Sequence, residues 1–214
     1  MRLELLRARL EPLPLHLPPP PRELTPVVVG GTDGRPTASP SFPALARRDA
    51  AVLILFHADE RGDALLTLTE RSAGGHRHAG QISLPGGAID DSDESVVAAA
   101  LREASEEVGL DTDQAGVNVI GALPTVDVPV SGFLVHPVVA FAERPPALTP
   151  DGYEVAEIIS APMAAFLPGA PIEVVTADRD GYLLRYGGYR IGAHHVWGAT
   201  AFLLARLGAF VGPV

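Results

Sequence analysis

Residues 86–110 read GGAIDDSDESVVAAALREASEEVGL, and this stretch decides both the fold and the chemistry of the chain. Its apolar residues recur with helical spacing up to about Val108, and Gly109 then offers the left-handed conformation that commonly follows a helix. One of residues 91–93 (Asp-Ser-Asp) is predicted to cap the helix, because short polar side chains accept hydrogen bonds from a first helical turn. We therefore expect a loop with two glycines that leads directly into a helix.

The predicted helix carries three glutamates on one stripe. With about 100° per residue, Glu106 and Glu107 lie within about 60° of Glu103 around the helix axis. Glu103 and Glu107 are like charges at i and i+4, which disfavours an isolated helix, and Arg102 is the only local cation. Acidic clusters are most often solvated helix faces. Clustered carboxylate oxygens are also what a hard divalent cation requires, and this spacing favours a metal site.

The composition excludes several chemistries. The chain has 214 residues and a formal net charge of −10, from 26 acidic and 16 basic residues, and every basic residue is Arg. Without Lys there is no Schiff-base or phosphate-loop lysine, and without Cys there is no disulfide, thiolate nucleophile or cysteine-bound zinc. The negative charge disfavours nucleic acid as a partner. We find no signal peptide and no apolar span, and so expect a cytoplasmic protein that does not bind membranes.

The order of the predicted elements indicates an α/β fold. A short helix at 2–11 and a Pro- and Gly-rich stretch form an N-terminal extension, residues 1–45, ahead of a domain at 46–214. Strands are expected at 50–56 and 64–70 (a hairpin), 82–84, 116–122, 134–142, 154–159, and in a hairpin over 172–191 that turns at Asp180-Gly181. A last helix is expected over about 196–210. Such alternation predicts a mixed α/β sandwich.

Residues 86–110 resemble the signature of the Nudix hydrolases, G-x5-E-x7-R-E-U-x-E-E-x-G-U, where U is aliphatic. The matching residues are Glu94, Arg102, Glu103, Glu106, Glu107, Gly109 and Leu110. Six residues instead of five separate Gly87 from Glu94, and Ala104 occupies the first aliphatic position. The resemblance implies an α/β/α sandwich around a mixed β-sheet. It also implies an enzyme that uses Mg²⁺ or Mn²⁺ to hydrolyse nucleoside diphosphates linked to another group.

A second block, LTERSAGGHRHAGQISLPGG at residues 68–87, resembles the element upstream of the signature in coenzyme A diphosphatases. Thr67 and Leu84 stand where that element has Leu and Phe, and His76 stands where it has Arg, with Arg77 beside it. Later segments also resemble this group, so the similarity covers about residues 50–205. It implies hydrolysis of coenzyme A or its derivatives to 3′,5′-ADP and 4′-phosphopantetheine.

The same resemblance implies a metal site on the predicted helix. Glu103 and Glu107 are the expected principal ligands of Mg²⁺ or Mn²⁺, and Glu106 and the Gly87 carbonyl complete or extend the site. The residues themselves agree, because an oxygen-only donor set suits Mg²⁺ or Mn²⁺ better than zinc. Arg102 is expected to orient a neighbouring carboxylate.

The remaining site residues concern proton transfer and substrate binding. An attacking water must lose a proton, and Glu106 and Glu154 are both candidate acceptors. The basic residues ahead of the acidic helix are expected to contact substrate phosphates: Arg71, His76 and Arg77. His194 and His195 are expected to pack rather than react.

Two alternatives stay open. One is a Nudix pyrophosphohydrolase for another nucleotide, such as ADP-ribose, NADH or a dinucleoside polyphosphate. The other is a non-catalytic nucleotide-binding regulatory module on the same fold. The sequence does not decide whether the N-terminal extension mediates a homodimer, covers the site or does neither.

Overall fold

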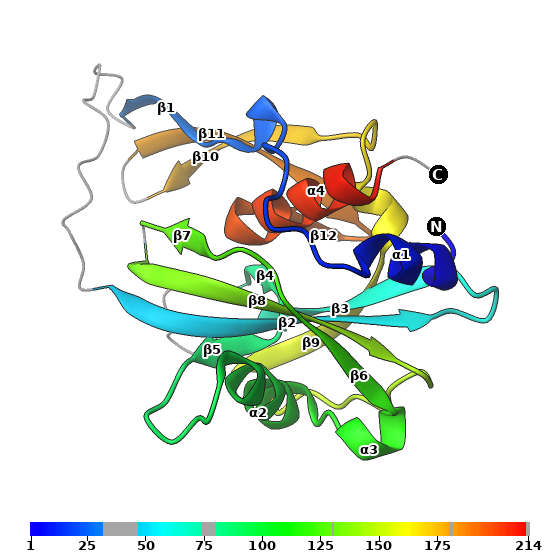
Figure 1. Ribbon diagram of the computed structural model, residues 1–214. Coiled ribbons are helices and arrows are strands. Elements are labelled where there is room, and N and C mark those ends of the chain that lie inside the picture. The colour runs from blue at the N-terminus through cyan, green and yellow to red at the C-terminus, as the bar shows by residue number, and fades with distance from the viewer. Residues whose placement is uncertain (32–46, 74–79, 130, 180–181, 213–214) are drawn as a thin grey trace.

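The centre of the molecule is a mixed sheet of eight strands (Figure 1). The computed structural model describes residues 1–31, 47–73, 80–129, 131–179 and 182–212. Within the sheet, β2 and β8 run parallel to each other and the other strand pairs are antiparallel. The strands are β2 (Arg48–Ala58), β3 (Ala64–Arg71), β4 (Ile82–Ser83), β5 (Gly86–Ala88), β6 (Val117–Ala122), β7 (Val126–Val128), β8 (Phe133–Ala142) and β9 (Val155–Pro162).

Strands β2 and β3 form the hairpin that the sequence predicts. Its turn is fixed by Asp59, whose carboxylate accepts hydrogen bonds from the backbone N–H groups of Arg61 and Asp63, each at 2.8 Å. The other strands predicted for this sheet are also confirmed, and β9 continues beyond its predicted end to Pro162. This hairpin and β9 carry the residues that face the predicted helix.

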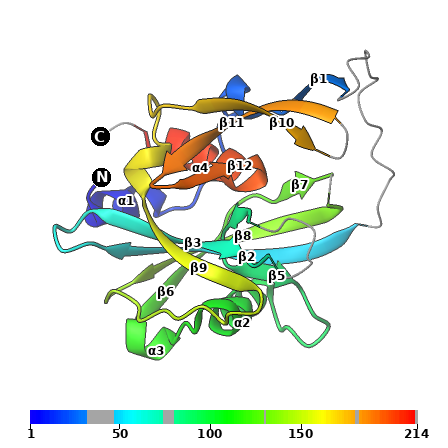
Figure 2. The ribbon, with the colours of Figure 1, turned by 180° about the vertical axis from the view of Figure 1, so that it is seen from behind.

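Helix α2 (Val96–Val108) covers one face of the eight-stranded sheet, followed by the short α3 (Thr112–Ala115) (Figures 1 and 2). Its inner side is made mainly of alanines, which allow the helix to approach the sheet closely. These side chains pack against apolar residues of β2 and β8 in one buried cluster: Ala99, Ala100, Ala104 and Val108 with Leu53, Leu55, Val138 and Ala140. The stripe of glutamates is therefore held at the border of a rigid core.

The start of α2 corrects the sequence prediction. Ser95 is the N-cap, because its Oγ accepts a hydrogen bond from the Ala98 N–H at 3.1 Å, and none of residues 91–93 has this role. Asp93 instead binds the guanidinium of Arg102, a partner that local capping rules do not consider. Gly109 ends the helix with a φ of 65°, as predicted.

The opposite face of the central sheet is covered by α4 (Gly198–Val211) and a second, four-stranded sheet (Figures 1 and 2). That sheet contains β1 (Val27–Gly31), β10 (Glu173–Arg179), β11 (Tyr182–Ile191) and β12 (His194–Trp197). The hairpin predicted over 172–191 is β10–β11, and its turn at Asp180-Gly181 lies outside the described residues. With helices on both faces of a mixed sheet, the predicted α/β/α sandwich is confirmed. Among the described helices, none is long and apolar enough to cross a membrane.

Residues 1–31 contribute to the core instead of only flanking it. The helix predicted at 2–11 is α1 (Leu3–Leu10), and it lies beside α4, where Arg9 donates a hydrogen bond to the Val211 carbonyl. Two short 3₁₀ turns, η1 (Arg22–Leu24) and η2 (Met163–Phe166), pack into the same core. Four leucines of this segment are buried, at about 1.5–3 kcal/mol each: Leu6, Leu10, Leu17 and Leu24. Strand β1 lies in the stretch where the sequence shows no periodicity.

Candidate metal centre

Two glycines of β5 allow the backbone to approach the carboxylates of α2. Strand β5 pairs with β2, so that Gly86 lies opposite Val52 and Gly87 opposite Ala51. Gly86 has a φ of 150°, and a Cβ there would collide with the backbone of Ala51 and Val52. A Cβ on Gly87 would occupy the space that the Glu103 carboxylate fills. Glycine is therefore required at both positions for the loop to pack against the helix.

Glu107 is a buried acidic residue of this region. It is only 5% exposed, and its Oε2 accepts a hydrogen bond from the Gly86 N–H at 2.9 Å. Burial raises the pKa of Glu107 to about 7; the Gly86 hydrogen bond and Arg71 oppose this, and the charges of Glu103 and Glu154 reinforce it. Carboxyl groups with such a raised pKa are often found at functional sites. A cation bound beside Glu107 would favour the ionised form of its carboxyl group.

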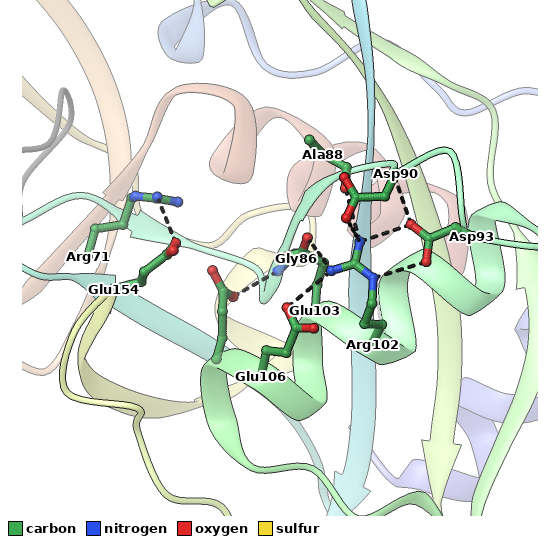
Figure 3. Close-up of polar contacts among 10 residues, drawn as sticks. Arg71, Gly86, Ala88, Asp90, Asp93, Arg102, Glu103, Glu106 and Glu154 are labelled. Carbon is green, nitrogen blue, oxygen red and sulfur yellow. Dashed lines mark hydrogen bonds and ion pairs between the residues drawn. The ribbon is translucent and has the colours of Figure 1, made fainter.

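Glu103 and Glu106 are both held by Arg102 (Figure 3). Nη1 of Arg102 donates hydrogen bonds to Oε1 of Glu103 at 2.9 Å and to Oε2 of Glu106 at 3.1 Å. Its Nε and Nη2 donate to the Asp93 carboxylate at 3.0 and 2.9 Å, and Nη2 also reaches the Ala88 carbonyl at 3.2 Å. The guanidinium thus clamps the loop before α2 to two glutamates of the helix.

The charges of this cluster are set by burial and by Arg102. Burial raises the pKa of Glu103, against the hydrogen bond and charge of Arg102, with Glu106 and Glu154 adding to the rise. The hydrogen bonds from Arg102 lower the pKa of Asp93, and Asp93 in turn raises the pKa of Arg102 well above its usual range. Arg102 is therefore a fixed positive charge, and the buried carboxylates remain short of counter-charge.

Glu154 faces this cluster from the residue just before β9. Its side chain is about half exposed and lies 3.8 Å from Nη2 of Arg71, which ends β3 (Figure 3). The Asp151 carboxylate accepts hydrogen bonds from the backbone N–H groups of residues 153–155, and the Asp151 N–H donates to the Glu107 carbonyl at 3.0 Å. The loop that carries Glu154 is thus anchored to the end of α2.

Most of the residues predicted from the sequence therefore meet in one place. The structure brings together Glu103, Glu106, Glu107, Glu154, Arg71, Arg102 and Gly87, which come from α2, β3, β5 and the start of β9. His76 and Arg77 lie outside the described residues. Sequence reasoning missed Asp93 and Asp151, which position Arg102 and Glu154. Asp151 stands at the head of Asp-Gly-Tyr, a turn signal that could have marked it.

The donor set fits a hard divalent metal ion. It offers carboxylate oxygens and the backbone of β5, with no Cys in the chain and no described His among the contacts of Glu103 or Glu107. The close approach of the Glu103 carboxylate to Gly87 leaves no room for a side chain there, as expected where backbone and carboxylates converge on a small ligand. These residues fit Mg²⁺ or Mn²⁺.

Comparison with known proteins identifies the family of the chain. Residues 46–170 match the model of the NUDIX domain family. A protein of Cronobacter sakazakii named "Uncharacterized Nudix hydrolase NudL" is 40% identical over 178 residues, covering 83% of this chain and 89% of that protein. The protein of the same name from Citrobacter koseri is 41% identical over 170 residues, covering 78% and 85%.

Two solved structures that are similar to part of this chain also carry Nudix names. "Crystal structure of a Nudix Hydrolase from M. Smegmatis, RenU" has 26% sequence identity and a TM-score of 0.47, covering 65% of this chain and 81% of that one. The NUDIX domain of Shewanella oneidensis NrtR, complexed with ADP ribose, has 20% identity and a TM-score of 0.43, covering 56% and 75%. On the family model and the two relatives, the chain belongs to the Nudix hydrolases, a family that acts on nucleoside diphosphate derivatives with divalent metals.

Proposed function

We propose that the protein hydrolyses the pyrophosphate bond of coenzyme A or a coenzyme A derivative, releasing 3′,5′-ADP and 4′-phosphopantetheine or its acyl form. One observation carries the proposal. Arg71 belongs to the block that resembles coenzyme A diphosphatases, and it lies against Glu154 and close enough to Glu107 to lower the pKa of that carboxyl group. A cation suited to phosphate therefore stands next to the carboxylates of the signature helix.

In this proposal the carboxylates of α2 hold the metal ion. Glu103 and Glu107 are the principal ligands of Mg²⁺ or Mn²⁺, and Glu106 and the Gly87 carbonyl complete or extend the site. When bound, such an ion polarises phosphoryl oxygens and lowers the pKa of a coordinated water. Arg102 fixes the orientation of Glu103 through its 2.9 Å hydrogen bond. Arg71 binds and orients the substrate phosphates, and His76 and Arg77 are proposed to extend this contact.

Glu154 is the proposed acceptor of the proton from the attacking water, in preference to Glu106. Glu106 accepts a hydrogen bond from Arg102 at 3.1 Å, so one of its carboxylate oxygens is already engaged by a guanidinium that also holds Asp93 and Glu103. Glu154 is held only loosely by Arg71 at 3.8 Å, and a substrate phosphate would compete for that arginine. Loss of a general base typically costs about 10²–10⁴-fold in rate.

The two candidate bases are separated by matched substitutions. We expect Glu154→Gln to lower kcat by roughly 10²-fold or more, while Glu106→Gln lowers kcat by roughly 10-fold or less. The measurement is steady-state hydrolysis from pH 5 to 9 at saturating Mg²⁺. A larger loss for Glu106→Gln than for Glu154→Gln would make Glu106 the base.

The substrate is tested with a panel. The purified protein and Mg²⁺ are incubated separately with coenzyme A, acetyl-coenzyme A, ADP-ribose, NADH and a dinucleoside polyphosphate, and the products are identified by mass spectrometry. We expect both 3′,5′-ADP and 4′-phosphopantetheine from coenzyme A, at the highest kcat/KM of the panel. Faster cleavage of another substrate would refute the coenzyme A assignment and keep the family chemistry. Binding without cleavage of any substrate would favour a regulatory module.

The proposed contact between Arg71 and the substrate phosphates is tested by substitution. We expect Arg71→Ala to raise KM for coenzyme A by roughly 10-fold or more, because one charge-assisted phosphate contact is lost. Arg61→Ala is the matched control, since Arg61 lies in the exposed β2–β3 turn. Equal KM values for the two variants would remove Arg71 from substrate binding.

A further inference from the structure

Two glutamates stand directly opposite each other on the face of β3 and β9 that points away from α2. Glu70 pairs with Glu157 in the register of these strands. Two residues away on the same face, Leu68 and Ile159 lie in the core that includes α4. Like charges directly opposite on antiparallel strands repel each other, so this pair needs a positively charged partner.

The second sheet provides a partner. His194 of β12 lies between the two carboxylates, with its Nδ1 3.4 Å from Oε2 of Glu70 and its Nε2 3.5 Å from Oε1 of Glu157. One potential ligand atom from each of the three residues lies within 4.8 Å of the other two. The His194 side chain is 19% exposed, so the imidazole is largely enclosed. The three residues join the eight-stranded sheet to the four-stranded sheet.

A cavity of about 400 Å³ opens beside this cluster. Glu70 and His194 form part of its wall, together with Ile82 of β4 and the rings of Tyr186 and Trp197, which are tilted by 37° with centroids 4.4 Å apart. The cavity therefore lies between the two sheets, on the side of β3 away from Glu103 and Glu107. A metal ion held by Glu70 and His194 would expose its open coordination position to this cavity.

We propose that Glu70, Glu157 and His194 form a second metal site, which takes a divalent transition-metal ion of the Zn²⁺ class. An imidazole with two carboxylates suits zinc better than Mg²⁺, which prefers oxygen ligands alone. Ligands at roughly 2.0–2.2 Å in a tetrahedral site lie about 3.3–3.5 Å apart. The 3.4 Å between Nδ1 of His194 and Oε2 of Glu70 matches this spacing, whereas the 3.5 Å contact of Glu157 is made with the other nitrogen, Nε2. One imidazole nitrogen binds one ion. Binding at Nδ1, beside Glu70, therefore requires the more exposed Glu157 carboxylate to move from Nε2 toward Nδ1.

The competing interpretation is an ion-pair network in which a protonated His194 bridges both glutamates. The two interpretations differ in what they predict for added metal. An ion-pair network does not bind Zn²⁺ and is unaffected by chelator, whereas the proposed site binds Zn²⁺. The site also lies on the opposite side of β3 from the proposed Mg²⁺ centre, so each can be removed while the other is kept. Its test is therefore independent of the substrate of the enzyme.

The test is a metal titration of the full-length protein. Glu103→Gln/Glu107→Gln, stripped with chelator, removes the proposed Mg²⁺ centre, and Zn²⁺ is then titrated by calorimetry, with Co²⁺ titrated in parallel by visible absorption. We expect one equivalent of Zn²⁺ and a Co²⁺ spectrum typical of a site with a nitrogen ligand. Adding His194→Asn or Glu157→Gln should weaken Zn²⁺ binding by at least 10-fold.

His136→Asn is the matched control, because His136 pairs with a single carboxylate, Asp49, at 2.7 Å. It should leave Zn²⁺ affinity unchanged. Far-ultraviolet circular dichroism checks that each variant is folded, and the exposed Glu157 position serves if the His194 variant is not. Unchanged Zn²⁺ affinity in the His194 and Glu157 variants, or no stoichiometric binding in the double variant, would overturn the site and leave an ion-pair network.

Discussion

The two faces of strand β3 carry two clusters of ionisable residues that are built in different ways. On the α2 side, Glu103 and Glu107 come from one helix and are four residues apart in the chain. On the other side, Glu70, Glu157 and His194 come from three strands of two sheets. Adjacent residues of β3 serve the two clusters, because Glu70 faces His194 and Arg71 faces Glu154.

The two clusters also differ in the cations that offset the repulsion between their carboxylates. On the α2 side, arginines supply part of the counter-charge and the buried Glu107 still has a raised pKa, so a further cation is favoured. On the other side, a single imidazole meets both carboxylates. The first donor set contains oxygen only and suits Mg²⁺, whereas the second contains nitrogen and suits a transition metal. The following predictions test this difference.

Glu107→Gln should have the largest effect. The amide keeps the size of the side chain but removes the charge of a proposed oxygen ligand, and we expect kcat to fall by roughly 10³-fold or more. Hydrolysis of the best substrate is measured at saturating Mg²⁺, with circular dichroism to show that the variant is folded. Glu60→Gln, in the exposed hairpin turn, is the control and should retain full activity. Retained turnover in Glu107→Gln would remove Glu107 from the metal site.

Arg102→Ala should have the next largest effect. Loss of a residue that orients metal ligands costs about 10–100-fold in metal affinity or activity. We expect a higher Mg²⁺ concentration for half-maximal activity and a lower kcat. Arg102→Lys should recover only part of both, because an ammonium group cannot contact Asp93, Glu103 and Glu106 with the fork geometry of a guanidinium. An unchanged Mg²⁺ requirement in Arg102→Ala would indicate that Arg102 only stabilises the fold.

The stability of the metal-free protein should depend on pH through Glu107. Its folded-state pKa of about 7 is above the value of 4.5 for an unperturbed glutamate, so the native state keeps a proton that the unfolded chain loses. This contribution is fully present below about pH 4.5 and is lost as the pH rises through 7, by up to about 3 kcal/mol.

Urea unfolding with EDTA at pH 5 and pH 8 measures this effect. We expect Glu107→Gln to reduce the pH dependence and, at pH 8, to be more stable than the wild-type protein. At the same pH, added Mg²⁺ should stabilise the wild type and have little effect on the variant. A variant with the same pH dependence as the wild type would mean that Glu107 is not the titrating group.

The α2 side could be predicted from the sequence because its spacing is local. Residues three and four apart on a helix share one face, so Glu103, Glu106 and Glu107 could be grouped before any tertiary structure was known. Arg102 beside them could be recognised in the same way. The fold class followed from the alternation of helices and strands, and the main hairpin from its turn.

The other side could not be predicted, because its residues meet only after the sheets have packed. His194 is separated from Glu70 and Glu157 along the chain, and β12 is a short strand that the sequence analysis did not identify. The sequence favoured packing for His194, and no periodic pattern points from it to a carboxylate. The wrong N-cap has another reason, since Asp93 is bound by Arg102 of the following helix, a side-chain contact that local capping rules do not consider.

Ser95→Ala tests the smallest of these differences, between a cap chosen by local rules and the cap that the structure contains. Removing the Ser95 Oγ leaves the Ala98 N–H without its acceptor, and we expect the free energy of unfolding to fall by about 1 kcal/mol. Ser92→Ala is the matched control, because Ser92 is exposed and lies within the predicted capping segment, and its effect should stay within about 0.5 kcal/mol. Urea unfolding of both variants measures the difference. A larger loss for Ser92→Ala would restore the capping position that the sequence predicts, and with it the view that local spacing alone defines the start of α2.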